Sequence, residues 1–478
     1  MILLWIILAL ICLFFAVILI RTLNFKPKSG PAVLEEEISF DKEKAVANLQ
    51  ALVRCKTISY HDHALEDEGE FEKLIAMLPE LYPNVFKACE FTRMPDRGLL
   101  FKWSGREAGD PAVMMSHYDV VPVNKEGWEK PPFAGILEDG VLWGRGTLDT
   151  KGTFNSVLFA ADHLISRGFV PRRDLYFAFS GGEEVNGPGA VHIVKWFEEQ
   201  GIIPSLVLDE GGAVVENVFP GVTKPCGLIG IAEKGYLDVK YETKSAGGHA
   251  SAPKPHTPVG ILARACCRME NKPFPCHLTK PVAEMFDTLS RHSTFLYRMI
   301  FANLWLFKGV LNMICKKSGG ELNALVRTTV AFTQASGSAA PNVIPPSASM
   351  TANLRLNPMD TVESATEYIR KTIGDDSITL TVKNGTDPSP ISQIDCEAWN
   401  KVASAVSATW DGCLVSPYLM VQCSDSRHYR DLSDHVYRFS AMDLTAEERA
   451  TIHGNNERIR LETAKSAVEF YIRLMRMC

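Results

Sequence analysis

Hydrophobic positions along the chain follow three patterns, and the first is a continuous apolar run at the N-terminus. No charged side chain precedes Arg21. As a helix rising ~1.5 Å per residue, such a run is about long enough to cross a hydrocarbon core of roughly 30 Å. The pattern therefore predicts a transmembrane helix over residues 1–22, followed by a linker over 23–39.

The second pattern consists of short apolar runs that alternate with segments of helical spacing. Three strand-length runs end in polar or Gly-rich turns: PAVMMSHYDVV (111–121), DLYFAFSGG (174–182) and PSLVLDEGG (204–212). The first two flank a predicted helix, GTFNSVLFAADHLISRG (152–168). This alternation predicts an α/β domain with a mainly parallel, three-layer αβα sheet.

The third pattern begins near Glu233 and has the order β-α-β-β-α-β. Its segments are GYLDVKYET, TPVGILARACCRME, RTTVAFTQ, ASMTANLRLNP, TVESATEYIRKTIG and ITLTVK. Such an order is typical of helices packed on an antiparallel sheet. We therefore predict an α+β domain over 233–386, inserted between the two parts of the larger domain, 40–232 and 387–478.

A long excursion, residues 271–325, separates the first helix of the inserted domain from its second strand. Its segment FLYRMIFANLWLFKGVLNMI (295–314) is rich in aromatic and aliphatic residues. A pair of core helices is the simplest interpretation. A hydrophobic substrate wall, a dimer contact and a membrane-facing patch remain alternatives.

Composition narrows the classes of function. The 478 residues carry a net charge of -6 with no long basic run, so we expect no nucleic-acid partner. The 12 cysteines are scattered and form no paired CxxC spacing, which favours reduced core thiols over a disulfide framework.

The residues around the apolar N-terminal run help to distinguish a membrane anchor from a cleaved signal peptide. A cleaved signal peptide normally has a basic segment first and a small-residue cleavage site, and neither is evident here. Arg21, Lys26 and Lys28 all follow the run. An uncleaved single-pass anchor is favoured over a signal peptide, and the positive-inside rule favours the cytoplasmic side for the rest of the chain.

Acidic residues and histidines gather where the predicted strands end. In parallel sheets, ligands bind at the carboxyl ends of strands. Mixed histidine and carboxylate ligation suits zinc, with cobalt or manganese as substitutes. Two ions need a shared carboxylate, and Asp149 is placed to be that bridge. The candidate metal ligands are His117, Asp149, Glu184, Asp209 and His453.

Two acidic residues beside these ligands suggest supporting roles. Asp119 is two residues along the same strand from His117, so it can accept the second ring N–H of that histidine. A satisfied core pair is the alternative. Glu183 and Glu184 are adjacent and point to opposite sides of an extended segment, so one can ligate while the other acts as general base. Without the other candidate residues, these two glutamates would also suit the solvent-exposed first turn of a helix.

Several motifs together resemble a known family. They are SHYDVVP, GRGTLDTKG, GGEE, LDEGG, GGHAS, NVIP, NLR and HGNNERI. In this order they are similar to the di-zinc exopeptidases and amidohydrolases related to aminoacylase, glutamate carboxypeptidase and dipeptidases. EGWEKPPFAG, AEKGY and NVIPP most resemble the carboxypeptidase S branch, which includes Gly-Xaa carboxypeptidases and N-fatty-acyl-amino-acid hydrolases.

The resemblance implies a role for each matching residue. His117 and Asp209 would hold one zinc ion, Glu184 and His453 the other, and Asp149 would bridge them. Glu183 would be the general base, and Asp119 would orient His117. The family pattern also has a cis peptide after the bridging aspartate, here Asp149 to Thr150.

The inserted domain resembles the family's lid and dimerisation domain. By that resemblance, His249 reaches the active site of the partner subunit in a homodimer and hydrogen-bonds the oxyanion. From sequence alone it is equally well a loop histidine. Asn342 and Arg355 match residues that bind the substrate's carboxylate end. Candidates from the family's substrate-binding loop, for which a structural cluster is an equal alternative, are Ser424, Asp425 and Arg427.

Taken together, these features predict a zinc-dependent hydrolase that cleaves the amide bond beside a C-terminal amino acid in short peptides. The alternative is an N-acyl amino acid amidohydrolase or synthase. A membrane-anchored scaffold with a dead site would lack a ligand or the base, and all are present.

Overall fold

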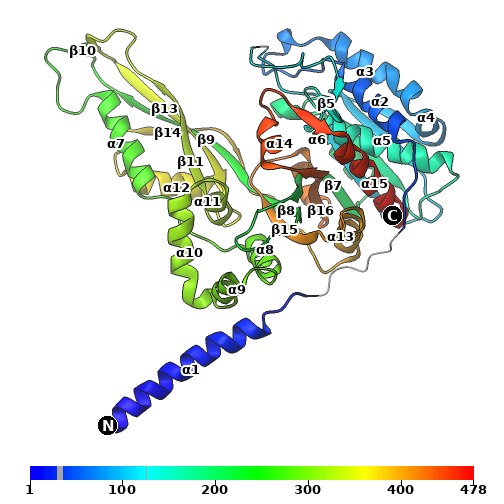
Figure 1. The fold of residues 1–478 in the computed structure, drawn as a ribbon. Helices are drawn as coiled ribbons and strands as arrows, with labels where there is room; N and C mark the ends of the chain where they lie inside the picture. Colours follow the sequence, from blue (N-terminus) through cyan, green and yellow to red (C-terminus); the bar gives the residue numbers. More distant parts are fainter. Residues whose placement is uncertain (29–35, 125) are drawn as a thin grey trace.

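An eight-stranded sheet forms the centre of the larger part of the molecule (Figure 1). The computed structural model describes residues 1–28, 36–124 and 126–478, so residues 29–35 of the predicted linker lie outside the described residues. The strands, in spatial order, are β1 (Glu90–Met94), β2 (Gly98–Trp103), β6 (Leu175–Ser180), β3 (Ala112–His117), β7 (Leu206–Val215), β16 (Val436–Leu444), β8 (Cys226–Glu233) and β15 (Leu414–Met420).

The middle of this sheet is parallel and buried on both faces. β3 pairs in parallel with β6 and with β7, and β7 with β16, whereas β1 and β2 form an antiparallel edge. Every residue of β3 is buried, because alternate side chains meet helices on opposite faces. Met114 joins one apolar cluster with α5, and Met115 joins another with α6. The predicted α/β class is thereby confirmed.

The helices of this part surround the sheet in two layers. One layer contains α2, α5, α13 and α15, which pack against one another, and α6 covers part of the other face. The helices are α2 (Lys42–Val53), α3 (Glu68–Leu81), α4 (Pro83–Ala88), α5 (Lys151–Ser166), α6 (Gly189–Gln200), α13 (Glu397–Thr409), α14 (Ala446–Thr451) and α15 (Leu461–Met477). A small side sheet joins β17 (Arg458–Arg460), β5 (Val141–Trp143) and β4 (Ile136–Glu138).

A second, four-stranded antiparallel sheet lies beside the first (Figure 1). The chain leaves the large sheet at the end of β8 and returns after β14. The elements, in chain order, are β9 (Gly235–Lys244), α7 (Pro258–Asn271), β11 (Thr329–Ser336), β13 (Ser347–Leu356), α12 (Val362–Ile373) and β14 (Thr379–Thr386). Buried residues of both helices pack on the sheet in one apolar cluster. Two short strands, β10 (Gly248–His249) and β12 (Val343–Ile344), pair at the outer tip.

Four helices make up the predicted excursion: α8 (Lys280–Ser290), α9 (Phe295–Ala302), α10 (Leu304–Ser318) and α11 (Gly320–Val326). Their buried side chains, such as Phe286 and Leu311, join a cluster with Leu228 and Leu419 of the large sheet. The excursion is therefore anchored on the large sheet, as core helices would be. Its outer face is exposed, however, with Trp305 and Met313 among the solvent-facing residues.

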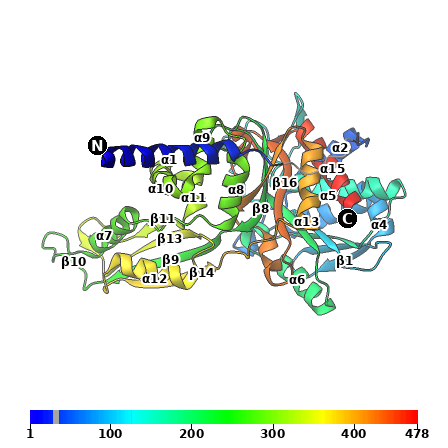
Figure 2. The same ribbon diagram turned by 90° about the horizontal axis from the view of Figure 1, so that it is seen from below.

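The N-terminal helix α1 (Ile2–Asn24) lies below the excursion in Figure 1, and in Figure 2, which is seen from below, it runs beside α9 and α10. It has a mean hydropathy of 3.3 and is almost entirely exposed. Among the described residues it is the one unbroken helix long and apolar enough to span a membrane. Polar contacts near its end attach it to α9, where Arg21 donates to the backbone carbonyl of Ala302 at 3.2 Å.

Candidate metal centre

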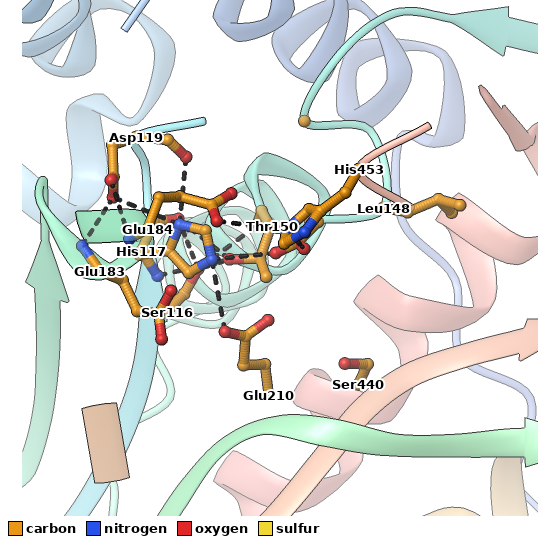
Figure 3. Close-up of polar contacts among 12 residues, drawn as sticks. Ser116, His117, Asp119, Leu148, Thr150, Glu183, Glu184, Glu210, Ser440 and His453 are labelled. Atoms are coloured by element: carbon orange, nitrogen blue, oxygen red, sulfur yellow. Dashed lines mark hydrogen bonds and ion pairs between the residues drawn. The ribbon is translucent and has the colours of Figure 1, made fainter. Parts of the chain in front are cut away.

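The candidate site forms where the parallel strands of the large sheet end (Figure 3). His117 is the last residue of β3, and Glu183 and Glu184 form a 3-10 turn shortly after β6. Glu210 lies within the neighbouring strand β7. Because β3, β6 and β7 are adjacent and parallel, their carboxyl-end side chains converge from three distant parts of the sequence.

His117 is held at both ring nitrogens. Its Nδ1 donates to the backbone carbonyl of Asp119 at 3.1 Å and lies 3.3 Å from that residue's carboxylate. Its Nε2 lies 3.0 Å from Asp149 and 3.3 Å from Glu210. The ring orientation is therefore set by Asp119, and Nε2 is directed at the carboxylates.

Asp119 also positions the acidic turn. Its fully buried carboxylate accepts the backbone N–H groups of Glu183 and Glu184, each at 3.2 Å. One side chain thus links the histidine of β3 to the turn after β6. If His117 and Asp119 were only a buried pair that satisfied each other, Asp119 would not need to bind the backbone of Glu183 and Glu184.

The second histidine reaches the same cluster from the far end of the chain. His453 lies between α14 and β17, with φ of 59°, and its Nε2 is 2.9 Å from Asp149 and 3.1 Å from Glu184. The two carboxylate oxygens of Asp149 therefore face different histidines, His117 and His453. This is the geometry expected of a bridging carboxylate. The Asp149–Thr150 peptide is cis, as the family pattern implies.

Burial and charge shift the pKa values of these groups strongly. Burial raises the pKa of Glu210 to about 8, although His117 opposes the shift. Burial also raises the pKa of Glu184, and the charge of Asp149 adds to that. Hydrogen bonds with Asp149 and Glu184 raise the pKa of His453 to about 11. Negative charge is thus concentrated in a buried space with few cations to balance it.

These residues fit a pair of divalent cations. Ligand atoms of two groups lie within 4.8 Å of one another: His117, Asp149 and Glu184, and His117, Glu183 and Glu210. Within the described ranges, Glu184 Oε1 is buried without a hydrogen-bond partner, as a ligand atom facing a cation would be. Neutral imidazole and carboxylate donors are those that zinc, cobalt or manganese accept.

Glu210, and not the predicted Asp209, is the β7 carboxylate that faces His117. The Asp209 carboxylate points away from His117. It accepts the backbone N–H of Ser426, a buried residue after β15, at 2.8 Å. Adjacent residues of a strand point to opposite faces, so only one of the two can reach the cluster. In LDEGG, as in GGEE, two adjacent acidic residues point to opposite sides of an extended segment, so the sequence offers either Asp209 or Glu210 as the residue that faces the site.

The predicted substrate-binding loop is largely internal. Ser424 and Asp425 are buried; the Ser424 amide donates to Glu233 at 2.9 Å, and Asp425 accepts a hydrogen bond from the Ser180 hydroxyl. Arg427 donates to Asn186 at 3.0 Å. These contacts support the structural-cluster interpretation. The neighbouring Cys423, which the motifs did not indicate, lines the pocket instead.

A pocket of about 690 Å³ opens onto the cluster. Asp149, Glu183, Glu210 and His453 lie in its wall, together with Arg355. Arg355 comes from β13 of the small sheet, so the pocket is built from both sheets of one chain. Most of its remaining wall is apolar and comes from β7, β8, β15, β16 and the loop before His453: Ala213, Val215, Leu228, Met420, Met442, Leu444 and Ile452.

His249 and Asn342 lie together, but not at this pocket. β10 and β12 pair at the outer tip of the small sheet, far from β7 (Figure 1). Both residues are exposed, Asn342 accepts the backbone N–H of Ala250, and the His249 ring contacts Ser251 at 2.7 Å. Arg355 and Asn342, predicted to share a ligand, are thus separated within one chain.

The sequence matches one family profile and several known proteins. A family profile described as Peptidase family M20/M25/M40 matches residues 113–477. The chain is 35% identical to N-fatty-acyl-amino acid synthase/hydrolase PM20D1 of Xenopus tropicalis, covering 96% of this chain and 92% of that protein. It is 32% identical to Probable carboxypeptidase S-like 2 of Dictyostelium discoideum, covering 96% and 91%. The crystal structure of the M20 family metallo-carboxypeptidase Sso-CP2 from Sulfolobus solfataricus aligns with a TM-score of 0.66 at 16% identity, over 91% of this chain and 98% of that one.

Proposed function

Because the chain belongs to peptidase family M20/M25/M40, whose members are metallopeptidases and amidohydrolases, we propose that it is a zinc-dependent hydrolase of amide bonds beside a free carboxylate. The family resemblance of the motifs is confirmed by the profile match. The observation that carries the proposal is one pocket that contains both the histidine–carboxylate cluster and Arg355.

Five residues would hold the two ions. His117 and Glu210 would bind one, Glu184 and His453 the other, and Asp149 both. Bound zinc ions would supply Lewis acidity, which polarises a carbonyl group and lowers the pKa of water. Asp119 keeps Nδ1 of His117 protonated, so that Nε2 presents its lone pair to an ion.

Glu183 is the proposed general base. Its side chain lies in the pocket wall, whereas that of Glu184 points at His453. A carboxylate in this position can take a proton from the attacking water and later deliver it to the leaving amine. Asp119 fixes the backbone of Glu183 and thereby the direction of its side chain.

Arg355 is the proposed partner of the substrate's carboxylate. Its guanidinium lies 4.9 Å above the Tyr236 ring and donates to the Cys423 sulfur at 3.4 Å. Neither contact neutralises its charge, and a guanidinium can bind a carboxylate through two parallel hydrogen bonds. Both peptides and N-acyl amino acids carry the required free carboxylate.

The apolar side of the pocket favours an N-acyl amino acid over a small dipeptide. Residues such as Val215, Leu228, Met420 and Met442 line the space around the cluster. Burying an acyl chain there gains roughly 0.8 kcal/mol per CH₂, whereas the charged amino group of a dipeptide would lose hydration.

A dipeptide remains a second candidate because a further acidic side chain, outside the histidine–carboxylate cluster, lies in the same pocket. Glu321 of α11 lines it and accepts a hydrogen bond from the Tyr418 hydroxyl at 2.9 Å. A carboxylate at this position can pair with a free ammonium group.

The separation of the tip from the cluster supports the proposal of a homodimer. We propose that His249 and Asn342 act in the pocket of the partner subunit, where His249 stabilises the oxyanion and Asn342 contacts the substrate. Their exposure and mutual proximity support this role, since both side chains are open to solvent and neither faces its own cluster.

We also propose that α1 is an uncleaved membrane anchor with the remaining chain on the cytoplasmic side. Its length and hydropathy support a span, and Arg21, Lys26 and Lys28 follow it. Digestion of sealed membranes with an added protease tests the orientation. Cleavage of the folded part from outside would contradict it.

The function is tested by incubating zinc-loaded protein with matched panels of N-acyl amino acids and dipeptides, and identifying products by mass. We expect amide hydrolysis that stops on chelation and returns with zinc. Turnover of acyl substrates should increase with chain length. Cleavage of dipeptides alone would favour the second candidate, and cleavage of neither would refute the proposal.

A further inference from the structure

Apart from its contacts with α1, the outer face of α9 and α10 has no packing partner among the described residues and carries exposed apolar side chains. Leu306, Val310, Met313 and Ile314 are exposed at spacings of four, seven and eight residues, which aligns them along one side of α10. Leu311 and Cys315 on the other side are buried against the large sheet. α10 thus has two apolar faces. One packs on the large sheet, and the other is exposed.

α1 is attached to this face through polar contacts. The side chain of Asn303, between α9 and α10, is fully buried and donates to Thr22 at 3.3 Å. Arg21 donates to the backbone carbonyl of Ala302. Buried polar contacts between otherwise apolar helices are typical of helix association in membranes.

A ring contact continues this attachment into the apolar part of α1. Trp305 packs edge-on against Phe14, with ring centroids 6.1 Å apart. Phe14 lies ten residues before Asn24, or about 15 Å at ~1.5 Å per residue. That is about half the thickness of a hydrocarbon core of roughly 30 Å. If this part of α1 lies in the bilayer, the exposed Trp305 lies beside it at the same depth.

From this continuity we infer that the exposed face of α9 and α10 lies in the same bilayer as α1. The two helices meet at 109°, a bend that suits a re-entrant contact with one side of the bilayer. Lys316 and Lys317 in the last turn of α10 are exposed, and their long side chains can reach lipid headgroups as α10 leaves the membrane. The inference rests on the proposed anchoring by α1.

The lipid contact can be mapped on the full-length protein in phosphatidylcholine vesicles that contain a phosphatidylcholine with a diazirine on its acyl chain. After illumination, adducts are located by mass spectrometry of peptides. We expect adducts within residues 295–314 as well as within α1. Adducts confined to α1, or cross-links joining α10 of two copies in place of lipid adducts, would overturn the inference.

Two methionines of equal exposure provide a matched pair. Met313 is 63% exposed on α10, and Met359 is 64% exposed in the small-sheet part. Met313→Asp should reduce adducts within 295–314 roughly fivefold, because hydrocarbon excludes an aspartate. Met359→Asp should leave them unchanged. Adducts on α1 report anchoring separately, and hydrolysis in the same vesicles reports the proposed function separately. Equal adduct yields in both variants would contradict the lipid contact.

Discussion

The cluster at the ends of β3, β6 and β7 and the tip formed by β10 and β12 differ in how complete they are. In the cluster, both histidines lie within 3.3 Å of carboxylates of the same chain. At the tip, His249 is exposed and its ring contacts only a neighbouring serine among the described residues. Both regions carry Gly-rich, histidine-containing motifs. The difference indicates that the cluster is assembled by the folding of one chain, whereas the tip takes part in a site only in the homodimer that we propose.

Glu183→Ala tests the cluster and should cause the largest loss of turnover. Loss of the proposed general base should reduce turnover by about 10²- to 10⁴-fold without releasing zinc, since Glu184, which faces His453, is the proposed ligand of the pair. Turnover and metal content are measured on the same preparation, with Glu198→Ala on the exposed side of α6 as control. Near-normal activity in Glu183→Ala would rule out this role.

His249→Ala tests the tip. Removing an oxyanion contact should lower turnover roughly a hundredfold. His256→Ala, an exposed histidine of the same loop, should have little effect. Because Glu183 and His249 would come from different subunits, mixed dimers of His249→Ala and Glu183→Ala chains contain one intact site. Activity should reappear on mixing, and its failure to do so would place both residues in one subunit.

A comparison of Glu210→Gln with Asp209→Asn sharpens the composition of the cluster. Glu210→Gln should weaken zinc retention by at least about tenfold, measured by competition with a chelator. Asp209→Asn should retain zinc but lower the melting temperature, because Asp209 accepts the Ser426 amide. The reverse pattern would restore Asp209 as the ligand.

Arg355→Lys should give the smallest effect. A lysine keeps the charge but not the paired hydrogen bonds, so KM should rise by roughly tenfold with little change in kcat. Mixing Arg355→Ala with Asn342→Ala chains extends the test, since Arg355 would act in its own subunit and Asn342 in the partner's. In a mixed dimer, one of the two sites should then contain both wild-type residues and show the wild-type KM. If no such site is detected, the two residues do not act across subunits.

Much of the fold followed from the sequence because it depends on local pattern. The buried runs of β3 and β6 and the alternation in β9 set strand type and face. The excursion at 271–325 was less predictable, since an apolar helix can face a core, a partner or lipid with the same composition. α9 and α10 in fact face the large sheet on one side only.

The sequence predicted the residues that gather in the candidate cluster, except on β7, where it indicated Asp209 in place of its neighbour Glu210. His117, Asp149, Glu184 and His453 stand at strand ends or in turns, where motif and position agree. The choice between Asp209 and Glu210 depends on strand register, and a one-residue shift reverses which side chain faces the site.

The α/β class, the inserted antiparallel sheet and the chemistry of a histidine–carboxylate cluster could be predicted from residue type and spacing along the chain. Three features emerged only from the folded molecule: Glu210 faces His117, Ser424 and Asp425 are internal, and His249 is remote from its own cluster. Each of these depends on which side chains distant segments bring together, and that is set by packing across the whole molecule.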